Sequence, residues 1–284
     1  MKSKIFKQYN VVGDDLCYHH TVTEASGKEY YHGPEAHQQF EVHFLLGGEV
    51  SYIIDGDTYD VKEGDMIFVA PNEIHALVIG GDKPYERVVL LFNMDILHQM
   101  MVELDATLGA FSYDGKNRFH LIGRADVKKY GLDKLLLSII NEEGIESHKK
   151  LGIISRLLRF IIAIDNVIKD SKDNFATPTA SDRLVASLTE YVDEHISEPI
   201  RLDKLAEVLY VSKSTLCHRF SSLMNMTVNQ YIIAKKMYRA AELLREGKSA
   251  QATAEAVGYD NYTSFFYNYK RIMGTSPTSS GNGD

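Results

Sequence analysis

Residues 40–92 alternate short apolar runs with turn-forming residues. The runs, each alternating or fully apolar, cover 42–46, 50–54, 58–61, 66–69, 75–79 and 87–92. Turn signals such as Gly47-Gly48, Asp55-Gly56 and Gly64-Asp65 separate them. Short strands at regular spacing, joined by Asp-Gly turns, predict an antiparallel barrel or sandwich in the first half of the chain.

The middle of the chain changes to a helical period. Segments 94–101 and 126–169 carry apolar residues three and four positions apart, which predicts helices. Residues 171–181 are polar, include Pro178 and lack periodicity, so we predict a linker there. The expected organisation is a first domain over 1–170 and a second over 182–284, which opens with a helix over 182–195.

Two similar helical patterns follow near the C-terminus. The first begins at Leu202 and runs through Ala206 to Phe220, and the second begins at Ala254 and runs through Gly258 to Pro277. Each predicts a short helix, a tight turn and a second amphipathic helix, the arrangement that presents a helix to a DNA major groove. One such pattern is weak, whereas two in tandem are specific.

The stretch between the two patterns sets their spacing. Residues 228–246 lack Gly and Pro, carry apolar residues at helical spacing and are preceded by a candidate N-cap, Thr227. Such a helix is a rod of roughly 28 Å. One turn of B-DNA is about 34 Å, so the two units are expected to enter successive major grooves.

Charge divides the chain in the same way. The whole chain has a net charge of −8, which argues against a nucleic-acid partner. Residues 201–271, however, hold eleven Lys and Arg against six Asp and Glu, a net charge of +5. The expected phosphate contacts are Arg219, Lys235, Lys236, Arg239, Lys270 and Arg271.

Side chains around the apolar positions of the two second helices are the expected base contacts. After the candidate N-cap Ser212, the first helix offers Lys213, Ser214, Thr215, Cys217, His218 and Arg219. The second, which we expect Asp260 to open, offers Asn261, Tyr262, Thr263, Ser264, Tyr267 and Asn268. Since only the first carries basic residues near its start, we expect it to supply more of the specific contacts.

These positions resemble the DNA-binding domain of the AraC family of transcription regulators. The match covers residues 202–277 and includes Leu205-Ala206, Ser212, Leu216, Phe220, Ala240, Leu243-Leu244, Ala254, Gly258-Tyr259, Phe265, Tyr269, Gly274 and Pro277. The chain departs from the family where Lys236 replaces the usual Arg, Thr253 an Ile and Ser264 an aromatic residue. The aromatic-Arg pair that usually follows the Pro is also missing.

The first half resembles, more loosely, the cupin-like effector domain of such regulators. The residues that match are His37, Glu41, Gly48, Asp55-Gly56, Gly64-Asp65, Pro71 and His75. The resemblance implies an antiparallel barrel, dimerisation through a pair of antiparallel helices, and sugars or related small carbon sources as effectors. The helices within 126–169 either form that dimer contact or only cover the barrel.

Strand parity and this resemblance together suggest a site inside the barrel. In an extended chain His37, Glu41 and His43 point to one face, and the resemblance directs His75 to the same place. With Tyr30, these side chains are expected to bind a small metabolite. A divalent metal on His37, Glu41 and His75 is the less favoured alternative, because Glu35 stands where cupins carry another His; we therefore assign no metal and no cofactor.

The sequence as a whole predicts a two-domain α+β transcription regulator: a cupin-like barrel with a helical pair, then an all-α domain with two helix-turn-helix units. The expected partners are promoter DNA, a small effector such as a sugar, RNA polymerase and a second copy of the chain. Two distant cysteines, no signal peptide and no apolar run of membrane length indicate the cytoplasm. The alternatives are a metal-dependent cupin enzyme fused to a DNA-binding module, and a constitutive regulator whose barrel only dimerises.

Overall fold

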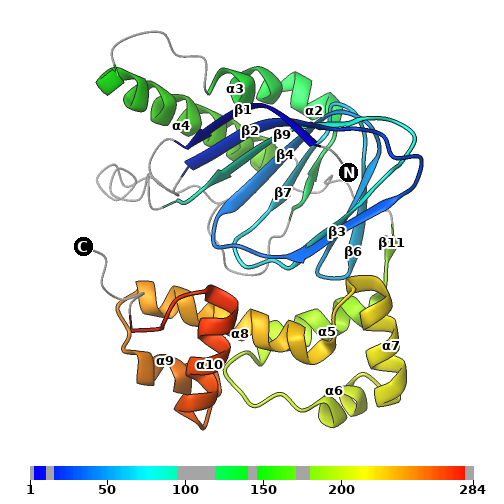
Figure 1. The fold of residues 1–284 in the computed structure, drawn as a ribbon, viewed down its shortest axis with the longest axis vertical. Helices are drawn as coiled ribbons and strands as arrows, with labels where there is room; N and C mark the ends of the chain where they lie inside the picture. The colour runs from blue at the N-terminus through cyan, green and yellow to red at the C-terminus, as the bar shows by residue number, and fades with distance from the viewer. Residues whose placement is uncertain (1–2, 11–15, 95–118, 140–145, 171–179, 279–284) are drawn as a thin grey trace.

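A computed structural model places two layers of antiparallel strands above a layer of helices (Figure 1). It describes residues 3–10, 16–94, 119–139, 146–170 and 180–278. Residues 95–101 of the helix predicted over 94–101, and most of the predicted linker, lie outside these residues. In the described chain no helix combines the length and the apolar character that crossing a bilayer requires.

The predicted strands are confirmed as β4 (Phe40–Gly47), β5 (Val50–Ile54), β6 (Asp57–Val61), β7 (Met66–Val69), β8 (His75–Ile79) and β9 (Tyr85–Phe92). Five further strands in the described chain were not predicted: β1 (Ser3–Asn10), β2 (Leu16–Thr23), β3 (Tyr30–Glu35), β10 (Leu121–Ile122) and β11 (Ala180–Ser181). One sheet has the order β1-β2-β9-β4-β7-β10, and the other continues β6-β5-β8-β3 from its edge strand β11 (Ala180–Ser181). The two sheets do not close on each other, so the expected barrel is corrected to two open facing sheets.

The alternation of side chains along β4 decides what each side of the first sheet meets. Val42 and Phe44 are buried against the helices α2 (Arg124–Lys129), α3 (Leu132–Ser138) and α4 (Glu146–Asp170), whereas Leu45 belongs to the core between the two sheets. Because successive strand residues point to opposite faces, Glu41 and His43 lie on the same side as Leu45. This parity places two polar side chains between the sheets.

The outer face of the second sheet packs on the C-terminal helices. Ile53 and Ile74 share a buried cluster with Val185, Phe220 and Tyr231 of those helices. Gly56 lies in the turn after β5 with φ +96°, and a Cβ there would come within 2.8 Å of Val185 Cγ1. Only glycine fits this backbone and this close approach. The second sheet and the C-terminal helices therefore meet directly.

The helical domain begins with α5 (Arg183–Glu194), followed by α6 (Leu202–Val208) and α7 (Lys213–Met224) as the first helix-turn-helix unit. The long helix α8 (Val228–Arg245) leads to the second unit, α9 (Ala250–Ala256) and α10 (Tyr262–Met273). Thr227 and Gln230 form a reciprocal capping box that starts α8, as expected for a helix with this N-cap. Ala180 and Ser181, within the predicted linker, pair with β6 instead of lying free.

Candidate functional site: a His–Glu cluster and two recognition helices

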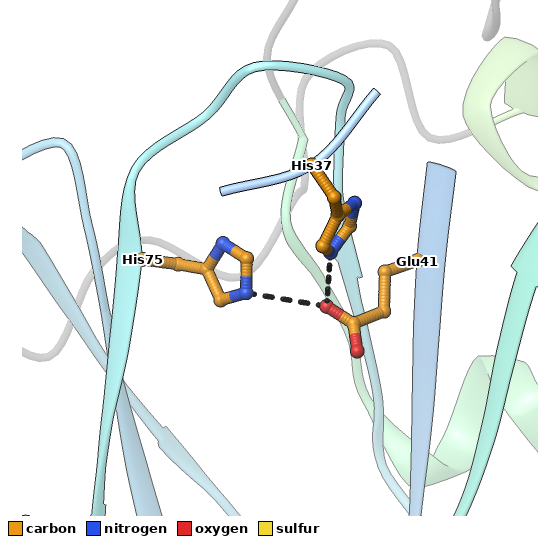
Figure 2. A group of neighbouring side chains, drawn as sticks. All are labelled: His37, Glu41 and His75. Carbon is orange, nitrogen blue, oxygen red and sulfur yellow. Dashed lines mark hydrogen bonds and ion pairs between the residues drawn. The ribbon is translucent and has the colours of Figure 1, made fainter. Parts of the chain in front are cut away.

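The structure brings four of the five predicted effector-site residues together between the sheets. Glu41 and His43 come from β4 in one sheet, and His75 comes from the first position of β8 in the other. His37 lies just before β4, and Figure 2 shows its ring and that of His75 directed at the Glu41 carboxylate. We call His37, Glu41, His43 and His75 the His–Glu cluster.

The reason for this grouping differs in part from the prediction. Strand parity accounts for Glu41 and His43, but β4 begins at Phe40, so His37 is not on the strand. A bend before Phe40 turns the His37 ring back, and its Nδ1 donates to the backbone oxygen of Gln39 at 2.9 Å. The fifth residue, Tyr30, lies opposite Ile79 at the other end of β3 and is 43% exposed, away from the cluster.

One carboxylate is the centre of the cluster. Glu41 Oε2 lies 2.9 Å from His37 Nε2 and 3.2 Å from His75 Nε2, while Glu41 Oε1 lies 2.6 Å from His43 Nε2. Burial by itself would raise the pKa of Glu41, but the three imidazoles outweigh it and hold the pKa well below its usual range. Glu41 is therefore an ionised carboxylate between the sheets.

His75 experiences the opposite balance. Burial by itself would lower the pKa of His75, yet the neighbouring Glu41 carboxylate and the Glu73 carbonyl raise it above its ordinary value. The Glu41 carboxylate thus favours a positive charge at Nε2 of the His75 ring. His37, Glu41 and His75 each offer one donor atom, all within 4.8 Å of one another, and they are the described residues that suit a metal ion.

The first recognition helix, α7, presents the expected side chains to solvent. Lys213, Ser214, Thr215, His218 and Arg219 are exposed, Cys217 is half-buried, and Leu216 and Phe220 hold the helix to the core. The Ser212 hydroxyl accepts the Thr215 N–H at 3.0 Å, so the predicted N-cap is confirmed. Contact of these side chains with bases stays a prediction.

The second recognition helix, α10, is opened by a different residue than expected. The side chain of Asn261, not Asp260, accepts the Ser264 N–H at 3.0 Å and caps the helix. As a cap, Asn261 uses its side-chain oxygen to accept a backbone hydrogen bond. Thr263, Ser264 and Tyr267 are exposed, and Tyr262 and Asn268 are half-buried.

The predicted phosphate contacts fall into three groups. Lys270 and Arg271 are exposed at the end of α10. Arg219 pairs with Asp182 at 2.7 Å and Arg239 with Glu242 at 2.7 Å, so each is engaged by a carboxylate of its own chain. Lys235 and Lys236 are buried, 6% and 4% exposed, which corrects their expected place on the surface.

Several residues between the two domains were not recognised from the sequence. Asp55, read only as part of a hairpin turn, is buried with φ +45° and accepts a 2.8 Å hydrogen bond from the Tyr231 hydroxyl of α8. Its other oxygen lies 3.5 Å from Lys235 Nζ. The pairing spans 176 positions of sequence, so no local pattern could signal it.

A sheet domain with a polar cluster, joined to tandem helix-turn-helix units, defines a class of protein: a one-chain regulator with a sensory and a DNA-binding domain. Residues 18–123 match the family described as AraC-like ligand binding domain, and residues 205–280 match the family described as Helix-turn-helix domain. The chain belongs to the AraC family of ligand-binding, DNA-binding transcription regulators.

Similar proteins include regulators from several bacteria. The Msm operon regulatory protein of Streptococcus mutans is 20% identical over 279 residues, which cover 96% of this chain and 95% of the relative. The thermoregulatory protein LcrF of Yersinia pestis is 20% identical over 85% of this chain and 89% of its own. Among solved structures, ToxT from Vibrio cholerae O395 is 11% identical and covers 94% of this chain and 99% of its own, with a TM-score of 0.39.

Proposed function

We propose that this protein is a cytoplasmic regulator that activates an operon for the use of a sugar or another small carbon source, and not an enzyme. A relative named as an operon regulator supports the operon, and the family resemblance supports the carbon source. The observation that carries a ligand-responsive function is that the His–Glu cluster and helix α8 are joined by the same two segments, 35–37 and 72–75.

The first link runs from the cluster to the middle of α8. The carbonyl of Ala36, next to His37, accepts a 2.8 Å hydrogen bond from the Tyr238 hydroxyl of α8. The Asn72 side chain donates to Glu242, one turn further along the same helix. The Asn72 N–H in turn donates to the His37 carbonyl at 2.8 Å, which ties the two segments together. A ligand that moves His37 would therefore move groups that hold α8.

The second link passes through the Asp55 turn. The Asp55 N–H donates to the carbonyl of Ile74, the neighbour of His75, at 3.2 Å. The Asp55 carbonyl accepts from Thr189 of α5 at 3.0 Å, and its carboxylate meets Tyr231 and Lys235 of α8. We propose that this turn transmits effector binding to the DNA-binding domain.

The coupling follows from population shift. A ligand that binds more tightly when α8 is docked stabilises the docked arrangement, and one that displaces His37 or His75 favours its release. In either case DNA must change the affinity for the ligand by the same factor. The contact holds buried charges, and a buried ion that loses its partner is costly. We therefore expect two discrete arrangements of the domains.

We also propose that two copies pair through α4. Leu151, Leu158 and Ile162 lie seven and four positions apart on one side of this helix, and Leu151 and Ile162 are 67% and 43% exposed. An exposed apolar stripe of this kind can pack against the same stripe on a second copy of the chain. Contact with RNA polymerase by the DNA-bound protein would complete the activator.

Selection of binding sites from a random duplex pool tests the proposed function directly. The full chain is expected to enrich two short motifs about 10 base pairs apart, one for each recognition helix. Lys213→Ala together with Arg219→Ala should abolish the enrichment, whereas Arg124→Ala, on α2 of the sheet domain, should leave it intact. Recovery of the pool unchanged by the unaltered chain would refute sequence-specific regulation.

A further inference from the structure

The two histidines that face Glu41 are held in one tautomer by the backbone. His37 Nδ1 lies 2.9 Å from the Gln39 carbonyl and His75 Nδ1 lies 3.0 Å from the Glu73 carbonyl. A carbonyl oxygen only accepts, so each Nδ1 must carry the proton. In a neutral imidazole the remaining nitrogen, Nε2, then has a lone pair and no proton.

If both rings are neutral, each Nε2 turns its lone pair toward an acceptor. The two Nε2 atoms lie 2.9 and 3.2 Å from the same oxygen, Oε2 of Glu41, as Figure 2 shows. His75 Nε2 is fully buried and, in the described structure, has no partner in hydrogen-bond geometry. Neutral rings would repel the carboxylate oxygen through these lone pairs, and an unsatisfied buried polar atom is costly. The arrangement needs a positive charge among these three atoms.

We infer that this positive charge is a divalent transition-metal ion bound by His37, Glu41 and His75. Two imidazoles and a carboxylate suit zinc, iron, cobalt, nickel or manganese, whereas magnesium and calcium prefer sets of oxygen donors. A second nitrogen anchored to a backbone carbonyl is also the usual support of a metal-binding histidine. Both histidines have this support, His37 from the Gln39 carbonyl and His75 from the Glu73 carbonyl.

The surroundings provide a further donor on the open side. Glu35 Oε1 lies 3.8 Å from His75 Nε2, and the Glu35 side chain is 46% exposed. The replacement of a histidine by Glu35, which weighed against a metal in the sequence, exchanges one donor for another. Donor atoms around a tetrahedral ion lie about 3.3 Å apart, close to the two distances measured at Glu41.

This inference deepens the proposed function by naming a ligand for the same site, and only the ion's role as effector depends on that function. A metal that joins His37 to His75 would fix segments 35–37 and 72–75 relative to each other. These are the segments that hold α8 through Ala36 and Asn72. The ion would therefore stabilise one arrangement of the two domains.

Metal binding is tested on the full chain after removal of metal with a chelator. Calorimetric titration with Zn²⁺ or Co²⁺ should give one equivalent bound, while Mg²⁺ should give none. Glu41→Gln and His75→Gln should each weaken Zn²⁺ binding by more than about 100-fold, beyond the range for a supporting partner. The matched control His148→Gln, an exposed histidine on α4, should bind like the parent. Absence of a stoichiometric complex, or full retention in both variants, overturns the inference.

A measurement on the unaltered protein guards against variants that do not fold. Histidine-ring NMR during Zn²⁺ addition should shift Nε2 of two histidines, and binding should weaken as pH falls because protons compete for the same lone pairs. If both rings are instead doubly protonated at neutral pH and unaffected by Zn²⁺, protons supply the charge and the metal assignment is wrong.

Binding-site selection with Zn²⁺ and with chelator separates the two proposals. A duplex affinity that changes with Zn²⁺ in the parent, but not in His75→Gln, supports the ion as effector, and an unchanged affinity refutes that role. Loss of sequence preference under both conditions refutes the regulator while leaving the metal site standing.

Discussion

Lys236 carries its ammonium group into the interior of the DNA-binding domain. Its Nζ donates to the carbonyls of Ile196, Glu198 and Val257 at 2.9, 2.7 and 2.6 Å, and so ties the end of α5 to α9 across α8. Burial lowers the pKa of Lys236 to about 8 despite the nearby Glu198 carboxylate. The Arg that is usual at this position in the family would also donate hydrogen bonds. Lys236 therefore differs in residue type but keeps the role of hydrogen-bond donor.

Replacing this donor should destabilise the domain. Lys236→Met is expected to lower the free energy of unfolding by at least about 2 kcal/mol, because it leaves three carbonyls without their partner. Lys236→Arg should recover most of the loss. Urea denaturation of the full chain measures both, with the exposed Lys270→Met as a control expected within about 0.5 kcal/mol of the parent. A Lys236→Met variant as stable as the parent would mean that other groups satisfy these carbonyls.

At the scale of the element, the two recognition helices are built alike but equipped differently. Both are capped by a side chain that accepts the N–H three residues on, and both are held by buried aromatic or aliphatic residues. Helix α7 carries Lys213, His218 and Arg219 on its exposed side, whereas α10 has no basic residue before Lys270. Electrostatics and hydrogen-bond donors therefore favour α7 as the main reader of bases.

This asymmetry predicts unequal effects of substitution. His218→Ala on α7 should reduce the preference for the selected duplex over random duplex by about tenfold, the low end for one good base contact. Thr263→Ala on α10 should reduce it less. Lys270→Ala should instead weaken selected and random duplex alike and lower the salt dependence of binding. Equal losses of preference at α7 and α10 would contradict the asymmetry.

The exposed stripe of α4 gives a prediction at the same scale. A charge within the stripe should separate two copies, because a desolvated carboxylate opposes burial of the stripe. Leu151→Glu is therefore expected to shift the protein from dimer to monomer in light scattering at micromolar concentration. Lys150→Glu, on the neighbouring exposed position, is the control. A parent protein that is already monomeric would remove α4 as a dimer contact.

At the scale of the whole molecule, the contact between the domains is held by charge as well as by apolar packing. Lys235 is bound on both sides, 3.5 Å from Asp55 and 2.8 Å from Asp193, and Asp55 also accepts from the Tyr231 hydroxyl. A lysine so enclosed cannot reach a phosphate while the domains are docked. Its place on α8 makes it part of the domain contact.

Neutralising Asp55 should loosen this contact without unfolding either domain. Asp55→Asn removes one of the two carboxylates around Lys235 and is expected to increase hydrogen exchange along α8 and the radius of gyration in X-ray scattering. The exposed Asp82→Asn should change neither. If hydrogen exchange along α8 in Asp55→Asn equals that of the parent, apolar packing alone holds the domains together. The Asp55 turn would then not be the proposed transmitter.

The sequence by itself determined whatever depends on neighbours along the chain. The six predicted strands, the N-caps Ser212 and Thr227, and the rod between the two helix-turn-helix units all follow from local period and capping. Strand β2 escaped notice because its polar Thr21 and Thr23 are buried where the pattern requires apolar residues, and Tyr30–Glu35 contains Gly33-Pro34, which is typical of a turn.

Only the tertiary structure decided which distant residues meet. Open facing sheets replaced the barrel because the pairing of sheet edges depends on contacts that no strand pattern encodes. The fate of two neighbouring lysines, one in the domain contact and one within the DNA-binding core, depended on carboxylates and carbonyls far away in the chain. Histidines can be counted in a sequence, but the backbone carbonyls that fix their tautomers, and so turn their lone pairs toward Glu41, exist only once the chain is folded.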